Sequence, residues 1–111
     1  MRKKVIAGNW KMNMLPGDTI NFIEQFAPLV KGTEHEVILC VPYTDIFYAW
    51  HTLEGTNIHL GAQNMHWEEK GAYTGEISAQ MLKSMGVEYV IIGHSERRAY
   101  FAETDETVNK K

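Results

Sequence analysis

EVILCVP at residues 36–42 and EYVIIGH at residues 88–94 are nearly continuous runs of aliphatic and aromatic side chains. Runs of this kind are typical of strands that are buried on both faces, as in a parallel sheet. Two further apolar runs, KVIAGNW at 4–10 and NIHLGAQN at 57–64, are also predicted to be strands. We therefore expect the chain to be built around a parallel β-sheet.

The segment between the first two predicted strands has the spacing of an amphipathic helix. In residues 17–32 the apolar side chains recur every three or four positions, with Asp18 or Thr19 as the expected N-cap and Gly32 as the stop. Pro28 lies inside this pattern and is expected to end or kink the helix early, because proline cannot donate a backbone hydrogen bond.

The later segments continue the alternation of strand and helix. Residues 44–55 are predicted to be a helix capped by Thr44, and residues 77–86 a shorter one. Residues 104–111 begin like a further helix and stop after about two turns, so we expect a chain truncated within its fourth helix. The regular alternation predicts an α/β fold with right-handed helical crossovers between parallel strands.

Composition places the chain in the ordinary globular class. Its 111 residues are 44% hydrophobic and 23% charged, which favours one domain over residues 1–111. The net charge is −3 and the basic residues are scattered, so no nucleic-acid partner and no membrane surface are expected. Cys40 is the single cysteine, which excludes an intrachain disulfide and favours a reducing, cytoplasmic location.

Polar side chains gather where the predicted strands end. Because the carboxyl ends of parallel strands meet at one edge of the sheet, this edge is where ligands bind in α/β folds. Taken singly, each residue has a simpler explanation, such as a surface lysine, a hydrogen-bonded core histidine, or a Glu96 that pairs with Arg97 or Arg98. Taken together they predict a site, and its members are Asn9, Lys11, Gln63, Asn64, His94, Ser95 and Glu96.

Three motifs in order along the chain resemble triosephosphate isomerase: AGNWKMN at 7–13, GAQNMHWEEKGAYTGEIS at 61–78 and IIGHSERR at 91–98. The resemblance covers the whole chain. It implies a (β/α)₈ TIM barrel, of which residues 1–111 would form the first four strands and about three and a half helices. It also implies a cytoplasmic homodimer of glycolysis and gluconeogenesis. The implied reaction interconverts dihydroxyacetone phosphate and D-glyceraldehyde 3-phosphate through an enediolate, without metal or cofactor.

The same resemblance implies a role for each residue at the strand ends. Asn9 and Lys11 would bind the substrate, with the lysine charge near the phosphate and the developing enediolate. His94 would be the electrophile, which in this well-studied family acts as a neutral imidazole beside a helix N-terminus. Ser95 would begin that helix, and Glu96 would help to hold Lys11 in place.

The resemblance also assigns the long loop at residues 65–76 to the dimer. In the family the corresponding loop enters the neighbouring subunit, so Thr74 would reach Asn9 and Lys11 of the partner subunit. Met14 would line the pocket that receives the loop. The alternative is a surface loop ordered by its own aromatic side chains.

The family's glutamate base and phosphate-binding loops follow later strands, so we expect this chain alone to be inactive. An open half-barrel would expose alternate residues of 37–41 and 90–92, at a cost on the order of 10–15 kcal/mol. The chain should therefore pair with a missing C-terminal half or with a second copy. The alternative function is a non-catalytic, self-associating half-barrel; another barrel enzyme acting on phosphorylated sugars is disfavoured by the motifs.

Overall fold

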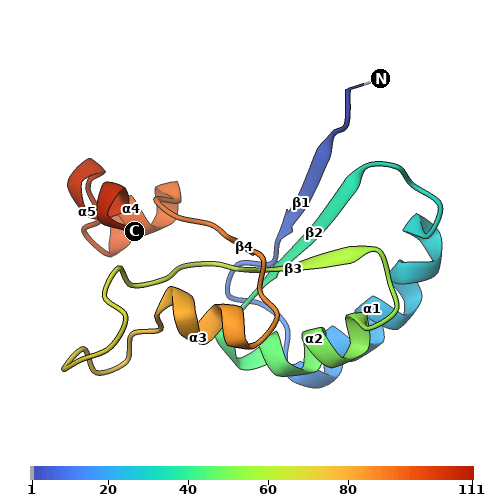
Figure 1. Cartoon of the computed structure of the whole chain (residues 1–111), viewed down its shortest axis with the longest axis horizontal. Helices are drawn as coiled ribbons and strands as arrows, with labels where there is room; N and C mark the ends of the chain where they lie inside the picture. Colours follow the sequence, from blue (N-terminus) through green and yellow to red (C-terminus); the bar gives the residue numbers. More distant parts are fainter. Residues whose placement is uncertain (1) are drawn as a thin grey trace.

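The computed structural model describes residues 2–111 and contains one four-stranded parallel sheet. The strands lie in the order β1-β2-β3-β4, so each one pairs with its neighbour in sequence. Helices join them along one side of the sheet (Figure 1). The predicted α/β half-barrel is therefore confirmed. Its strands are β1 (Val5–Asn9), β2 (Glu36–Val41), β3 (Ile58–Ala62) and β4 (Tyr89–Val90).

Helices and a 3₁₀ turn occupy the connections that the sequence pattern predicts. The element bounds are α1 (Pro16–Val30), η1 (Tyr43–Asp45), α2 (Ile46–Leu53), α3 (Ala79–Ser84), α4 (Ser95–Tyr100) and α5 (Asp105–Lys110). None of the helices in residues 2–111 is long and apolar enough to cross a membrane.

The apolar core lies between the sheet and the helices α1 and α2. All five residues of the segment 37–41 are buried in β2, which lies between β1 and β3. The expected exposure of alternate residues in this segment is therefore wrong. Apolar exposure falls instead on strands at the sheet edges, where Val5 is 60% and Ile6 53% exposed.

The start of α1 differs from the prediction. The helix begins at Pro16 with Leu15 in the N-cap position, rather than with Asp18 or Thr19. Proline is favoured in the first helical turn because its fixed φ suits the helix and its missing N–H has no partner there. Asp18 contributes from within the first turn, where its Oδ2 accepts a hydrogen bond from the Leu15 N–H at 3.0 Å.

Pro28 does not end α1 early. It lies in the last turn, and the helix continues to Val30. A proline so close to the C-terminus removes a single intrahelical hydrogen bond, so the cost is tolerated. The Val30 carbonyl is in turn satisfied by Asn57 Nδ2 at 2.9 Å, from the segment that leads into β3.

The predicted Thr44 cap of the second helix is also wrong. A 3₁₀ turn intervenes, and α2 starts at Ile46 with Asp45 in the N-cap position. Asp45 is completely buried and accepts hydrogen bonds from the hydroxyls of Thr44 at 3.2 Å and Thr19 at 3.0 Å. The Thr44 hydroxyl is thus used by a buried carboxylate that ties α1 to α2, and it is not free to cap the helix.

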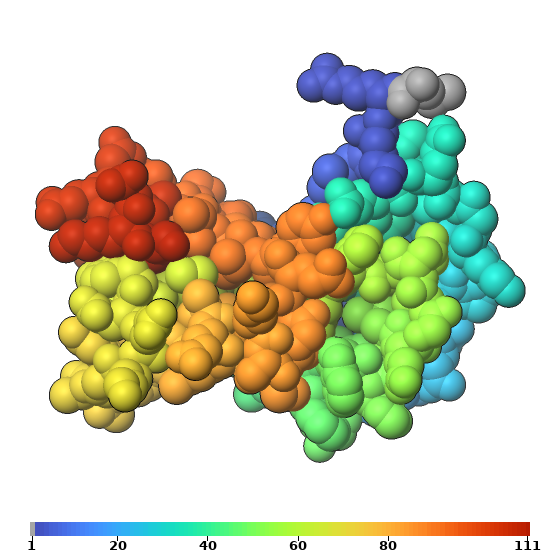
Figure 2. Space-filling view, in the orientation of Figure 1, coloured from blue at the N-terminus to red at the C-terminus, as the bar shows by residue number. Residues whose placement is uncertain are grey.

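The segment after β3 departs from the prediction in its strand, whereas its two short helices agree with those expected to begin at Ser95 and within residues 104–111. Strand pairing in the apolar run 88–94 covers Tyr89–Val90, and the Ile91 N–H adds one further hydrogen bond to the Ala62 carbonyl at 2.9 Å. The chain then forms two short helices, α4 and α5, separated by Ala102 in the left-handed region at φ 57°. In the space-filling view the loop at 65–76 (yellow) and α5 (red) pack together into one lobe (Figure 2).

Gly86 is a position where we expect a substitution to destabilise the fold. It follows α3 with φ +80°, and a Cβ added there would lie 2.4 Å from Trp50 Cδ1. Gly86→Ala combines a left-handed backbone cost of about 1–2 kcal/mol with overpacking of about 1–3 kcal/mol. Urea denaturation should therefore show a free energy of unfolding lower by about 2–5 kcal/mol.

Gly17→Ala is the matched control for this measurement. Gly17 lies inside α1, and an added Cβ would meet nothing within 4 Å. Alanine there should stabilise the chain by about 0.5–1 kcal/mol. Equal effects of the two substitutions would contradict the assignment of Gly86 as a tight turn against Trp50.

Candidate active site

Lys11 is held in an unusual backbone conformation just beyond the end of β1. It has φ 56°, a region that costs a non-glycine residue about 1–2 kcal/mol. Its N–H donates to Asn9 Oδ1 at 2.9 Å, and its carbonyl accepts from Gln63 Nε2, also at 2.9 Å. Gln63 Nε2 also donates to the Cys40 carbonyl at 3.0 Å. The ends of three strands therefore fix the lysine backbone, and strained residues of this kind cluster at functional sites.

The Lys11 side chain pairs with the first turn of α4. Its Nζ lies 2.7 Å from Glu96 Oε1. The alternative pairing of Glu96 with a neighbouring arginine is wrong, because Arg97 pairs with Glu103 and Arg98 with Asp105. The fold thus brings together two charged residues that lie near opposite ends of the chain.

The ion pair shifts the pKa of both partners. The hydrogen bond that Lys11 Nζ donates to Glu96, together with the negative charge of that carboxylate, raises the pKa of Lys11 above 10.5. The hydrogen bond from Lys11 lowers the pKa of Glu96 below 4.5. Because the pKa of Lys11 is higher in the folded than in the unfolded chain, the pair stabilises the fold below pH 10.5. This stabilisation is lost as the pH rises through the pKa of Lys11 in the folded chain. The Glu96 contribution is present above pH 4.5 and is lost as pH falls through its folded value, so both are present at neutral pH.

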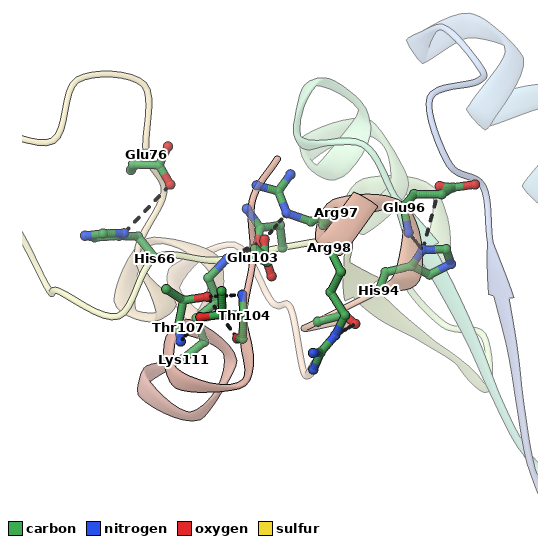
Figure 3. Close-up of polar contacts among 12 residues, drawn as sticks. His66, Glu76, His94, Glu96, Arg97, Arg98, Glu103, Thr104, Thr107 and Lys111 are labelled. Carbon is green, nitrogen blue, oxygen red and sulfur yellow. Dashed lines mark hydrogen bonds and ion pairs between the residues drawn. The ribbon is translucent and has the colours of Figure 1, made fainter. Parts of the chain in front are cut away.

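His94 occupies the N-cap position of α4, and Ser95 is the first residue of that helix. The Glu96 N–H donates to His94 Nδ1 at 3.0 Å (Figure 3). Because Nδ1 accepts this bond, the proton of a neutral ring is on Nε2. The side chain is 28% exposed, so Nε2 is left as a donor for a ligand at the strand ends.

The loop at 65–76 has a small aromatic core of its own. The His66 ring lies 4.3 Å from Trp67 and 4.6 Å from Tyr73, measured between ring centroids. The loop extends away from the strand ends (Figure 1). Within residues 2–111 no hydrogen bond joins Thr74 or Met14 to Asn9 or Lys11. Asn9, Lys11, His94 and Glu96 thus belong to one edge of the sheet, whereas the loop does not reach it within this chain.

Gln63 is a residue to which the sequence assigned no function beyond its place at a strand end. Its contact with Lys11 was not predictable from spacing. The one available signal was that the first and third predicted strands end at the same edge of the sheet. Among the residues described, no group of three or more His, Cys, Asp or Glu side chains is placed to hold a metal ion.

The Lys11–Glu96 pair predicts a measurable titration. Glu96→Gln removes the negative charge that holds the lysine proton, so the pKa of Lys11 should fall back toward 10.5. The ¹³Cε shift of Lys11 followed by NMR between neutral and strongly alkaline pH measures this change. Glu106→Gln, on the surface of α5, is the control and should leave the titration unchanged; an unchanged curve in Glu96→Gln would show that the pair does not form.

Comparison with known proteins gives a consistent result. The family model described as triosephosphate isomerase matches residues 4–111. The triosephosphate isomerase of Alkaliphilus oremlandii is 62% identical over 111 residues, which are 100% of this chain and 45% of that protein. The Caldanaerobacter subterraneus enzyme is 59% identical over the same shares.

A solved structure shows the same similarity in three dimensions. The crystal structure of triosephosphate isomerase from Bartonella henselae matches with a TM-score of 0.92 at 44% identity, over 99% of this chain and 46% of that one. The four parallel strands therefore match part of a TIM barrel, and the chain spans slightly less than half the length of these relatives. On the family match over residues 4–111, the chain belongs to the triosephosphate isomerase family.

Proposed function

We propose that this chain contributes the N-terminal half of a triosephosphate isomerase active site. The whole protein would interconvert dihydroxyacetone phosphate and D-glyceraldehyde 3-phosphate in the cytoplasm, as a step of glycolysis and gluconeogenesis. Residues 1–111 would be the first part of a single TIM-barrel domain. The observation that carries the proposal is the hydrogen bond from the Glu96 N–H to His94 Nδ1, because it leaves a neutral ring with its proton on Nε2.

The chemistry of the reaction explains why this tautomer matters. Moving a proton between adjacent carbons through an enediolate develops negative charge on the carbonyl oxygen. A donor aimed at that oxygen lowers the barrier, and a neutral Nε2–H is such a donor. His94 would be the electrophile and would carry the proton between the two oxygens.

Lys11 and Asn9 would bind the substrate beside the histidine. The Asn9 Oδ1 is occupied by the Lys11 N–H, so its Nδ2 is the group left to donate to a ligand. The ammonium of Lys11 would neutralise the negative charge of the phosphate and of the enediolate. Glu96, whose Oε1 lies 2.7 Å from Lys11 Nζ, would orient the ammonium. No metal or organic cofactor enters this scheme, and the carbon-bound proton would be removed by a glutamate from the half of the barrel that follows β4 in the relatives.

The loop at 65–76 would complete the site across a dimer. Thr74 would reach Asn9 and Lys11 of the partner subunit, and Met14 would line the pocket that receives the loop. The packing of His66 against Trp67 and Tyr73 supports this role, because a preformed loop loses less conformational entropy when it binds.

Completion of the barrel tests the proposal. We would join this chain to the remaining C-terminal portion of the Alkaliphilus oremlandii relative, and call the product the completed chimera. It should isomerise triose phosphates when purified from a host that lacks its own isomerase, whereas the 111-residue chain should give only background turnover. A well-folded chimera without activity would overturn the proposal, as would robust turnover by the chain alone.

A second candidate function rests on the exposed edge of the sheet. Val5 and Ile6 are more than half exposed on β1, and unpaired edge strands recruit further strands. The chain would then be a non-catalytic half-barrel that self-associates. Native mass spectrometry separates the two: multiples of 12.7 kDa alone support self-association, and a bound partner of ~15 kDa, the rest of a barrel of typical size, supports the isomerase.

A further inference from the structure

We propose that Arg98 is a positioning residue for His94: it fixes the Gly93–His94 peptide so that the imidazole keeps its orientation at the strand end. This inference rests on the proposed function, in which His94 is the electrophile. Arg98 itself does not face the site, and it is not expected to touch substrate.

The backbone before His94 needs an external restraint. Gly93 adopts φ +64°, which is open to glycine but not a conformation that glycine alone would keep. It follows β4, whose pairing with β3 covers Tyr89–Val90, with one further backbone hydrogen bond from the Ile91 N–H to the Ala62 carbonyl at 2.9 Å. Among the described residues the sheet hydrogen bonds therefore end at Ile91, before Gly93, and the restraint must come from elsewhere.

Arg98 supplies contacts to two successive carbonyls around the histidine. Its Nε donates to the Gly93 carbonyl at 2.9 Å. Its backbone N–H donates to the His94 carbonyl at 3.1 Å, a bond of the first turn of α4. One residue thus holds the peptide groups on both sides of His94, and Figure 3 shows the Arg98 and His94 side chains leaving the same turn in different directions.

Helix α5 holds the arginine in place. Arg98 Nη1 lies 2.7 Å from Asp105 Oδ1, at the first residue of α5. Val108 of the same helix packs against Gly93, since a Cβ added at Gly93 would lie 2.8 Å from one Val108 methyl group. The Asp105 side chain is 98% exposed, and an exposed pair of this kind contributes little to stability. The pair would instead orient the arginine, because the planar guanidinium contacts the Gly93 carbonyl oxygen and Asp105 Oδ1 in a fixed geometry.

Arg98→Met tests the inference, because methionine keeps an unbranched stem and loses every donor. In the completed chimera we expect kcat to fall about tenfold, equivalent to about 1.4 kcal/mol in the barrier, with KM within about twofold. In the same chimera we expect faster hydrogen exchange of the Glu96 amide. The ring ¹⁵N chemical shifts of His94 should also change from values typical of the Nε2–H tautomer toward those of a mixture of the two neutral tautomers.

The controls separate positioning from a loss of stability. Glu106→Gln changes an exposed residue one position further along α5 that pairs with Lys110, and it should leave kcat, exchange and ring shifts unchanged. Arg98→Lys keeps the charge without the planar fork and should give intermediate values; it decides the question if Arg98→Met fails to fold.

Unchanged Glu96 exchange and His94 ring shifts in the Arg98 variants would overturn the inference. The same changes in Glu106→Gln would also overturn it, since they would show a general effect of α5. These NMR measurements do not depend on turnover. If His94→Gln leaves the chimera fully active, the proposed function fails, while the spectra still decide whether Arg98 positions the ring.

Discussion

Replacing His94 with glutamine in the completed chimera is expected to lower kcat by about 10²–10⁴-fold, the range of general acid–base catalysis by a side chain. Glutamine can accept the Glu96 N–H, as His94 Nδ1 does at 3.0 Å, so the turn that starts α4 should survive. Its amide cannot exchange a proton with the substrate oxygens at neutral pH. The loss should therefore appear in kcat, with KM changed little.

Steady-state kinetics in both directions of the reaction, with circular dichroism to verify folding, measure this effect. The matched control is His51→Gln, which changes an exposed histidine in the last turn of α2. That variant should retain full kcat. A His94→Gln variant whose kcat lies within about threefold of that of the unmodified chimera would contradict the assignment of His94 as the electrophile, because general acid–base catalysis contributes about 10²–10⁴-fold.

Removal of the Lys11 charge is expected to have the second largest effect. Lys11→Met keeps an unbranched side chain and the same left-handed backbone cost at φ 56°, so the ammonium is the main difference. Loss of an electrostatic stabiliser at a site of developing charge lowers kcat by about 10²–10³-fold. KM should rise as well, because the lysine also attracts the phosphate of the ground state.

Two observations check this second prediction. Lys11→Arg keeps the positive charge but replaces a compact ammonium with a planar fork, so it should recover only part of the lost activity. In Lys11→Met the pKa of Glu96 should rise toward 4.5, because its hydrogen-bonded partner is gone. Full activity of Lys11→Met would exclude the lysine from the reaction, whatever the structure of the variant.

Most of the fold was predictable because the strands carry a strong local signal. The run at 36–41 is apolar at nearly every position and forms the central β2, as a strand buried on both faces should. The order of strands and helices followed from this alternation. Helix starts were not predictable, because they depend on partners outside the helix. The Thr44 hydroxyl bonds to the buried Asp45, which also holds Thr19 of α1.

The sequence by itself determined the residue types at the strand ends: an amide at 9, a lysine at 11, and the histidine and glutamate at 94 and 96. Parallel pairing then requires these ends to share one edge, so their proximity also follows from the pattern. The resemblance already implied that Glu96 holds Lys11, and the structure selected this pairing over the arginine alternative. Only the tertiary structure decided that Gln63 bonds to the Lys11 carbonyl and Arg98 to the Gly93 carbonyl. The physical reason is that hydrogen bonds require atoms within about 3 Å of each other. Sequence periodicity places a residue on a face or an edge, whereas the packing of strands and helices sets where its side-chain atoms lie.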